Sequence, residues 1–204
     1  QANAEGMDGP SIEWLRNMAQ RTGSVICGSL IIEAQSSYYN RLIWMRPDGT
    51  HGHYDKRHLF RMAQEEKHYS AGNSRSIFTL KGWRICPLVC YDLRFPVWSR
   101  GVNEFELLIY IANWPSARRS AWQVLLPARA VENLCFAAGV NRIGTDGNDR
   151  DYCGDSSVFD YLGRPLNQCE DTPCVTTVTL DAAGLKRYRE KFPAWLDADQ
   201  FELR

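Results

Sequence analysis

The sequence has no excess of charge of either sign. Lysine and arginine together number 24, and so do aspartate and glutamate, which leaves a formal net charge of zero. No basic block or acidic tail stands out along the chain. Because nucleic acids and anionic membrane surfaces attract clustered positive charge, we expect neither as a partner.

Long apolar runs are absent as well. No stretch approaches the roughly 20 apolar residues of a membrane-spanning helix, and the first residues lack the pattern of a signal peptide. A chain of 204 residues is long enough for one α/β domain with a large core. These features predict a single cytoplasmic domain over residues 1–204.

The seven cysteines lack the spacing of a metal site. The close pairs, Cys86 with Cys90 and Cys169 with Cys174, are not of the C-x2-C type, and the one His-x-His sequence has no obvious third ligand. Most cysteines lie in apolar runs and their number is odd, which suits a reducing compartment better than a disulfide framework. We therefore expect neither a metal nor a disulfide framework.

Apolar periodicity predicts four helices. Residues 11–22 place apolar side chains on one face, with Ser11 able to cap the start and Gly23 able to end it. The other helical segments are 96–101, 118–134 and 182–190. Pro127 should kink or interrupt the longest of them, because proline lacks the N–H that a helix interior needs.

Short apolar runs bounded by turn residues predict the strands. They are 24–32, 38–45, 50–54, 77–80, 83–89, 107–112, 136–140, 156–159 and 174–180. Residues 46–49, Arg-Pro-Asp-Gly, have the chemistry of a turn, so the strands beside them should form an antiparallel hairpin. The run 107–112 is apolar throughout, which indicates that both faces are covered, whereas 141–155 should be a loop. This pattern supports an α/β fold with a mixed sheet.

A thiol follows one of the predicted buried strands. Cys90 comes directly after the run 83–89 and begins a turn that carries charge and then Pro96. In open α/β sheets, ligands bind at the carboxyl ends of strands. The backbone N–H of Tyr91 could there point at an oxygen that becomes charged during acyl transfer. Cysteine is also among the residues most often buried, so the position alone leaves a core role open.

Three predicted strand ends carry polar residues that could converge: Lys56, Cys90, and Asn113 with Trp114. Strands of one sheet that run the same way place their ends along one edge. A lysine near a cysteine favours the thiolate, and its ammonium could stabilise a tetrahedral oxyanion. A carboxylate beside the thiol would act as general base and then as acid for departing ammonia.

Three motifs in this order resemble the nitrilase (carbon-nitrogen hydrolase) superfamily. They are 54–60 (YDKRHLF), 90–96 (CYDLRFP) and 154–156 (GDS). Within the superfamily the sequence is most similar to the omega-amidases, which hydrolyse the terminal amide of 2-oxoglutaramate and 2-oxosuccinamate. The resemblance runs from about residue 11 to the C-terminus, and three spaced motifs are more specific than any one of them.

The resemblance implies a Glu-Lys-Cys catalytic set, of which Lys56 and Cys90 are present. It also implies a second glutamate in the loop after the lysine, which Glu65 fits best, with Glu66 as the alternative. The implied fold is a four-layer α-β-β-α sandwich, commonly assembled into homodimers or larger homo-oligomers. The implied chemistry passes through a thioester on the cysteine and needs no metal or organic cofactor.

A 2-oxo acid amide also brings a carboxylate, which an arginine could bind in bidentate fashion. The candidate arginines are Arg94, Arg118, Arg119 and Arg142. Trp114 could form a wall of a small-substrate pocket or belong to the core, and Asn113 is a further substrate-binding candidate at the same strand end. Asp92 and Arg94 are expected to pair with each other or with the loop backbone.

The sequence departs from the family at the general-base glutamate. That residue typically lies in a Pro-Glu pair upstream of the first helix, and this chain has no such pair. Glu5 precedes the helix, but no apolar strand comes before it to position it. We therefore expect that an opening β-α-β portion carrying the base is missing. Two alternatives stay open: an amidase, carbamoyl hydrolase or nitrilase that acts on another small C–N substrate, or a non-catalytic fragment or pseudoenzyme.

Overall fold

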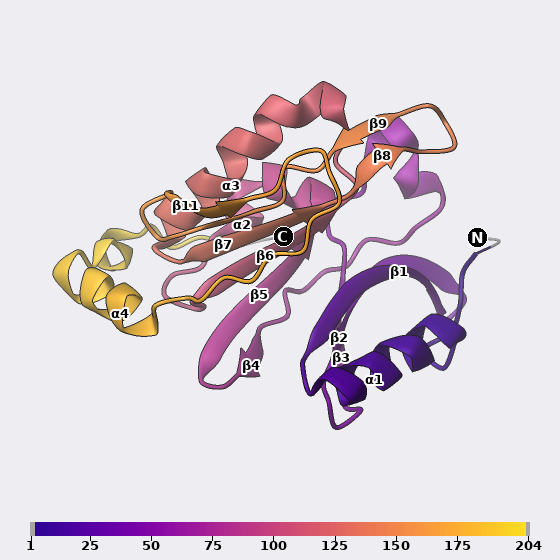
Figure 1. Ribbon diagram of the computed structural model, residues 1–204, viewed down its shortest axis with the longest axis horizontal. Helices are drawn as coiled ribbons and strands as arrows, with labels where there is room; N and C mark the ends of the chain where they lie inside the picture. Colours follow the sequence, from indigo (N-terminus) through magenta and orange to yellow (C-terminus); the bar gives the residue numbers. More distant parts are fainter. Residues whose placement is uncertain (1–2, 203–204) are drawn as a thin grey trace. The chain divides into compact units, whose positions relative to one another are not determined.

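The computed structural model describes residues 3–202. The chain divides into two compact units, Gln1–Ser76 and Ile77–Arg204, each of which combines helices with a β-sheet. Figure 1 shows the helices and strands of both. The predicted α/β class is therefore confirmed, and the stacking of two sheets into four layers stays a prediction.

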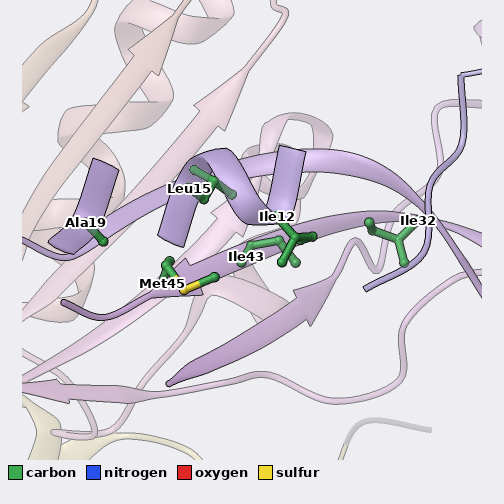
Figure 2. Packing of buried hydrophobic residues seen from close by; sticks show 6 residues of the cluster. All are labelled: Ile12, Leu15, Ala19, Ile32, Ile43 and Met45. Atoms are coloured by element: carbon green, nitrogen blue, oxygen red, sulfur yellow. The ribbon is translucent and has the colours of Figure 1, made fainter. Parts of the chain in front are cut away.

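The first unit packs one helix on a three-stranded antiparallel sheet (Figure 1). Its elements are α1 (Pro10–Thr22), β1 (Ile26–Ala34), β2 (Ser37–Met45) and β3 (His51–Asp55). The apolar face of α1 contributes Ile12, Leu15 and Ala19 to the core. Ile32 of β1 and two residues of β2 complete the buried cluster, which Figure 2 shows between helix and strands. The turn at 46–49 joins β2 to β3 as an antiparallel hairpin, as predicted.

The start of α1 differs from the prediction that Ser11 caps it. Gly9 is the N-cap residue and provides no side-chain cap. Instead, the Glu5 carboxylate accepts the backbone N–H of Ser11 at 2.8 Å. Glu5 is held there by backbone hydrogen bonds to Ile31 and Glu33 of β1, so it is positioned although no strand precedes it. The helix ends at Gly23 in the left-handed conformation, as predicted.

The second unit contains a six-stranded sheet in the order β11-β10-β7-β6-β5-β4. The strands are β4 (Phe78–Leu80), β5 (Trp83–Val89), β6 (Leu107–Ala112), β7 (Phe136–Asn141), β10 (Ser157–Phe159) and β11 (Pro165–Gln168). The central strands β5, β6 and β7 are parallel to one another, and the outer strands pair antiparallel. The sheet is therefore mixed, with its parallel part in the middle.

Helices and short hairpins surround this sheet. The helices are α2 (Pro96–Ser99), α3 (Arg119–Asn133) and α4 (Ala182–Lys191), and a separate hairpin joins β8 (Ile143–Thr145) to β9 (Asp151–Cys153). In Figure 1, α3 lies along one face of the sheet. Gly139 of β7 permits this close packing, because a Cβ there would lie 2.5 Å from a methyl carbon of Leu126. Among the described residues, no helix is both long and apolar enough to cross a bilayer.

Three predictions about local structure need correction. The helix α3 continues through Pro127, since its buried face holds it on the sheet. The segment 141–155 contains the β8–β9 hairpin rather than only a loop. The segment 174–180 is not a strand, because its β-favouring residues are mostly exposed, and Pro165–Gln168 pairs with β10 instead. In β6, every residue is buried or half-buried, which agrees with the prediction that both faces are covered.

The cysteine prediction also needs a correction. Cys169 and Cys174 form a disulfide, although the sequence analysis favoured reduced cysteines. The chain turns back after β11 and brings the two Cα atoms to 6.0 Å, within the usual range for a disulfide. Five other cysteines are free thiols, namely Cys27, Cys86, Cys90, Cys135 and Cys153. The single short loop that is closed does not amount to a disulfide framework.

Candidate active site

The carboxyl ends of three parallel strands meet at one edge of the second unit's sheet. Val89 of β5 pairs with Ile111 of β6, and Ala112 of β6 pairs with Asn141 of β7. The residues at or directly after these ends include Cys90, Asn113 and Asn141. The predicted meeting of Cys90 with Asn113 and Trp114 is therefore confirmed within this unit.

Cys90 occupies a sharp turn. Its φ angle is 47°, a left-handed conformation that residues other than glycine rarely adopt. The turn continues as the 3₁₀ helix η3 (Cys90–Arg94), and the Cys90 thiol donates a long hydrogen bond of 3.8 Å to the carbonyl of Asn113. The residue is only partly buried, whereas Cys86 on the same strand is fully buried. This placement suits a nucleophile better than a core residue.

Two buried charged residues hold the Cys90 turn. Asp92 is fully buried and its carboxylate accepts the N–H of Val89 at 3.0 Å, which confirms the predicted bond to loop backbone. Arg129 of α3 donates two hydrogen bonds to the carbonyl of Leu93, at 2.7 and 3.1 Å. The sequence analysis missed Arg129. The only signal in the sequence was a charged residue among the apolar positions of 118–134. That signal could not identify the Leu93 carbonyl as the partner of Arg129.

Buried Lys56 forms an ion pair with half-buried Glu65 in the first unit. Lys56 directly follows β3, is 2% exposed, and its Nζ lies 2.6 Å from Glu65 Oε2. The same carboxylate oxygen accepts the N–H of Phe60 at 2.8 Å. Glu66, the alternative partner, is exposed. Lysine is almost never fully buried unless it is paired, so Glu65 is the group that allows Lys56 to remain inside.

The position of Lys56 corrects one step of the sequence reasoning. We expected Lys56 and Cys90 to end strands of one sheet, but β3 belongs to the three-stranded sheet of the first unit. The loop after Lys56 closes tightly: the N–H of Gly72 donates to the Lys56 carbonyl at 3.0 Å. A Cβ on Gly72 would lie 2.1 Å from the carbonyl oxygen of Asp55, so only glycine fits there.

Asn141 joins the ends of neighbouring strands through its side chain. Its Oδ1 accepts the N–H of Trp114 at 2.7 Å, and its Nδ2 donates to the carbonyls of Trp114 and Gly154 at 3.1 and 2.9 Å. Its backbone exchanges hydrogen bonds with the hydroxyl of Ser156. Asn141 is not among the site residues predicted from the sequence, because nothing in the local pattern indicates these long-range partners.

The third motif, Gly154-Asp155-Ser156, links the strand-end edge of the sheet to α3 by hydrogen bonds. Asp155 is 3% exposed and forms a bidentate pair with Arg119, at 2.7 and 2.8 Å. The Asp155 carbonyl accepts the indole N–H of Trp122 at 3.0 Å. The hydrogen bond to Asp155 raises the pKa of Arg119 above its ordinary value. Because Asp155 occupies the Arg119 guanidinium, we remove Arg119 from the candidate partners of a substrate carboxylate.

The other predicted substrate-binding residues lie near the same strand ends. Trp114 is 3% exposed, and its indole N–H donates to the carbonyl of Arg118 at 2.8 Å, so most of its ring belongs to the core. The guanidinium of Arg94 lies over the Trp114 ring, 5.3 Å from its centroid. Arg142 is exposed and lies over the ring of Tyr152 at 4.6 Å. Arg94 and Arg142 thus keep exposed guanidinium groups.

Within residues 3–202, no group of three or more His, Cys, Asp or Glu side chains is arranged to hold a metal ion. A partly exposed thiol on a strained turn is suited to nucleophilic attack on an acyl carbon.

Comparison with known families agrees with this chemistry. The carbon-nitrogen hydrolase family model matches residues 1–190. The chain belongs to this family. It is 50% identical over 194 residues to omega-amidase YafV of Escherichia coli, covering 94% of this chain and 75% of the relative. It is 33% identical over 195 residues to 2-oxoglutaramate amidase of Bacillus subtilis, covering 93% and 75%. These matches identify the chain as an amidohydrolase and confirm the omega-amidase resemblance.

Solved structures show the same fold. XC1258 from Xanthomonas campestris, a CN-hydrolase superfamily protein with an arsenic adduct in its active site, is 49% identical with a TM-score of 0.97, covering all of this chain and 80% of that one. An amidase from Nesterenkonia sp. AN1 is 26% identical with a TM-score of 0.78, covering 90% and 73%. That structure records the addition of acrylamide at the active-site cysteine. The α/β nitrilase-type fold is thereby confirmed.

Proposed function

We propose that this carbon-nitrogen hydrolase removes the terminal amide of a small 2-oxo acid amide, such as 2-oxoglutaramate or 2-oxosuccinamate. The similarity to omega-amidase YafV and to 2-oxoglutaramate amidase supports this substrate class. The observation that carries the mechanism is the Cys90 thiol, partly exposed in a left-handed turn at the carboxyl end of β5. The exposed guanidinium groups of Arg94 and Arg142 are proposed to bind the substrate carboxylate.

The proposed reaction has two steps. The Cys90 thiolate adds to the amide carbon, and the Lys56 ammonium and the Tyr91 N–H stabilise the resulting oxyanion. The C–N bond then breaks, nitrogen leaves as ammonia, and a thioester remains on Cys90. Water adds to the thioester, which releases the 2-oxo acid and restores the thiol. In this scheme the Lys56 ammonium is held by Glu65.

A glutamate is assigned both proton transfers, first to the leaving nitrogen and then from the attacking water. The family resemblance implies this residue, and no Pro-Glu pair in the 204 residues matches it. Glu5 is not proposed for the role, since its carboxylate accepts the N–H of Ser11 at the start of α1. Homodimers or larger homo-oligomers and a cytoplasmic location also stay predictions of the sequence.

The direct test measures ammonia release from 2-oxoglutaramate by a chain that includes the predicted general-base glutamate. Cys90→Ala should abolish release, because Cys90 is the proposed nucleophile, and Cys27→Ala should retain it. Cys27 is the matched control: burial raises the pKa of its thiol to about 11, although part of the residue is exposed. Undiminished release by Cys90→Ala would contradict the proposal. Absence of release by the unmodified protein, with intact folding, would favour the non-catalytic alternative.

A second candidate substrate class is a simple aliphatic amide. The similarity to the Nesterenkonia amidase, one structure of which is a complex with butyramide, favours this class. A substrate panel separates the two candidates. Faster turnover of butyramide than of 2-oxoglutaramate would favour the simple amide, whereas a preference for the 2-oxo acid amide would support the first proposal.

A further inference from the structure

Asn141 makes more side-chain hydrogen bonds to backbone than ordinary packing requires. The side-chain amide bonds both backbone groups of Trp114: Oδ1 accepts the N–H at 2.7 Å, and Nδ2 donates to the carbonyl at 3.1 Å. The second Nδ2 proton goes to Gly154 at 2.9 Å. Asn141 is 8% exposed, so water competes little for these hydrogen bonds. The backbone around Trp114 is therefore fixed from both sides.

The peptide that Asn141 fixes is also the one that the Cys90 thiol contacts. The N–H of Trp114 and the carbonyl of Asn113 belong to a single planar peptide group. Oδ1 of Asn141 accepts from the nitrogen of that group, and the Cys90 sulfur donates to its oxygen at 3.8 Å. The orientation of the thiol thus depends on a peptide plane that Asn141 holds.

We infer that Asn141 is a positioning residue for the Cys90 nucleophile, acting through the peptide between Asn113 and Trp114. The carbonyl oxygen of Asn113 accepts a hydrogen bond from the thiol, which orients the sulfur. Asn141 does not touch the sulfur. Its effect on hydrolysis rests on the proposed function, whereas its effect on thiol reactivity does not.

The test compares Cys90 in the unmodified protein with Cys90 in Asn141→Ala. Iodoacetamide is applied at fixed pH, and alkylation of the Cys90 peptide is followed by mass spectrometry. Alkylation should become about fivefold faster, the factor that corresponds to one ordinary hydrogen bond. Ammonia release should move in the opposite direction, with kcat reduced roughly tenfold to a hundredfold and KM little changed, because the sulfur is misplaced for attack.

Asn167→Ala is the matched control. Asn167 lies on β11, and its side-chain oxygen accepts the N–H of Val158 at 2.8 Å, so its loss also removes a side-chain to backbone bond in this sheet. It should leave the alkylation rate of Cys90 unchanged. Cys86 reports on folding, because it is fully buried on β5 and should stay protected in every variant.

Asn141→Asp provides a second variant of the same size. It keeps an acceptor for the Trp114 N–H and loses the donors to the two carbonyls, so Cys90 alkylation should lie between the rates of Asn141→Ala and the unmodified protein. Equal alkylation rates in Asn141→Ala and Asn167→Ala would overturn the inference. Loss of Cys86 protection in both Asn141 variants would also overturn it, since Asn141 would then act in folding alone. If Cys90 alkylation changes as expected in the Asn141 variants but the unmodified protein releases no ammonia, the inference stands and the proposed function is contradicted.

Discussion

At the scale of single residues, Cys90 and Lys56 carry the proposed chemistry. Without compensating contacts, the backbone conformation of Cys90 and the burial of Lys56 would each be unfavourable. Cys90 adopts a left-handed conformation without being glycine, which costs of order 1 kcal/mol or more. Lys56 keeps an ammonium group at 2% exposure. Such states persist only where surrounding contacts compensate, here the bonds of Asp92 and Arg129 around the turn and the Glu65 carboxylate beside Lys56. This compensation is typical of functional positions.

The Lys56–Glu65 pair gives a prediction at this scale. Glu65→Gln removes the negative charge and keeps an oxygen acceptor, so the free energy of unfolding should fall by about 2 kcal/mol, less than complete loss of a buried partner. Urea unfolding measures the change. Glu66→Gln is the control, because Glu66 is the exposed neighbour, and it should have an effect within about 0.5 kcal/mol. Equal effects of the two variants would show that the pair does not stabilise the protein.

At the scale of elements, the candidate site depends on hydrogen bonds from helix α3 to the turn after β5. The guanidinium of Arg129, 3% exposed, reaches the Leu93 carbonyl and also pairs with Glu132 at 3.0 Å. Asp155 binds the first turn of the same helix through Arg119. Two buried polar contacts thus connect α3 to loops at the strand ends, in addition to its apolar face.

Replacing the arginine tests this connection. Arg129→Met preserves much of the side-chain volume but leaves the Leu93 carbonyl without its two donors, so the free energy of unfolding should fall by roughly 2 to 4 kcal/mol. Ammonia release by the folded fraction should fall roughly tenfold or more, because the Cys90 turn loses its support. Arg164→Met, which changes an arginine in an exposed turn, is the control. Unchanged activity at reduced stability would limit Arg129 to a folding role.

Elements were predictable from the sequence where one local pattern decided them. The run 107–112 became β6 with the expected bounds, and the turn at 46–49 joined the expected hairpin. Prediction failed at 174–180, where β-favouring residues are exposed and form no strand. It also failed at the start of α1, where the carboxylate of Glu5, rather than the side chain of Ser11, accepts a backbone N–H of the helix. Residue preference measures local conformation, and neither burial nor long-range partners can be read from it.

At the scale of the whole molecule, the chemistry proposed for this hydrolase depends on a few residues that are far apart in the sequence. The sequence motifs identified Lys56, Glu65 and Cys90, but Arg129 and Asn141 could not be found that way, because their partners lie 36 and 27 residues away. The central claim is that the Cys90 thiolate adds to an amide and that the Lys56 ammonium stabilises the oxyanion. The predicted general-base glutamate would complete this set.

The most direct measurement is the pH dependence of Cys90 alkylation with and without the ammonium. Glu65→Gln is compared with the double variant Lys56→Met, Glu65→Gln, so that no carboxylate is left unpaired, and iodoacetamide modification of the Cys90 peptide is followed across pH. Burial raises the pKa of Cys27 and Cys135, so these thiols react slowly, and the mass of the peptide separates them from Cys90. An adjacent ammonium favours the thiolate, so its removal should raise the midpoint of the Cys90 profile by roughly one pH unit or more. Superimposable profiles from two folded proteins would contradict the claim that the Lys56 ammonium acts on the Cys90 thiol.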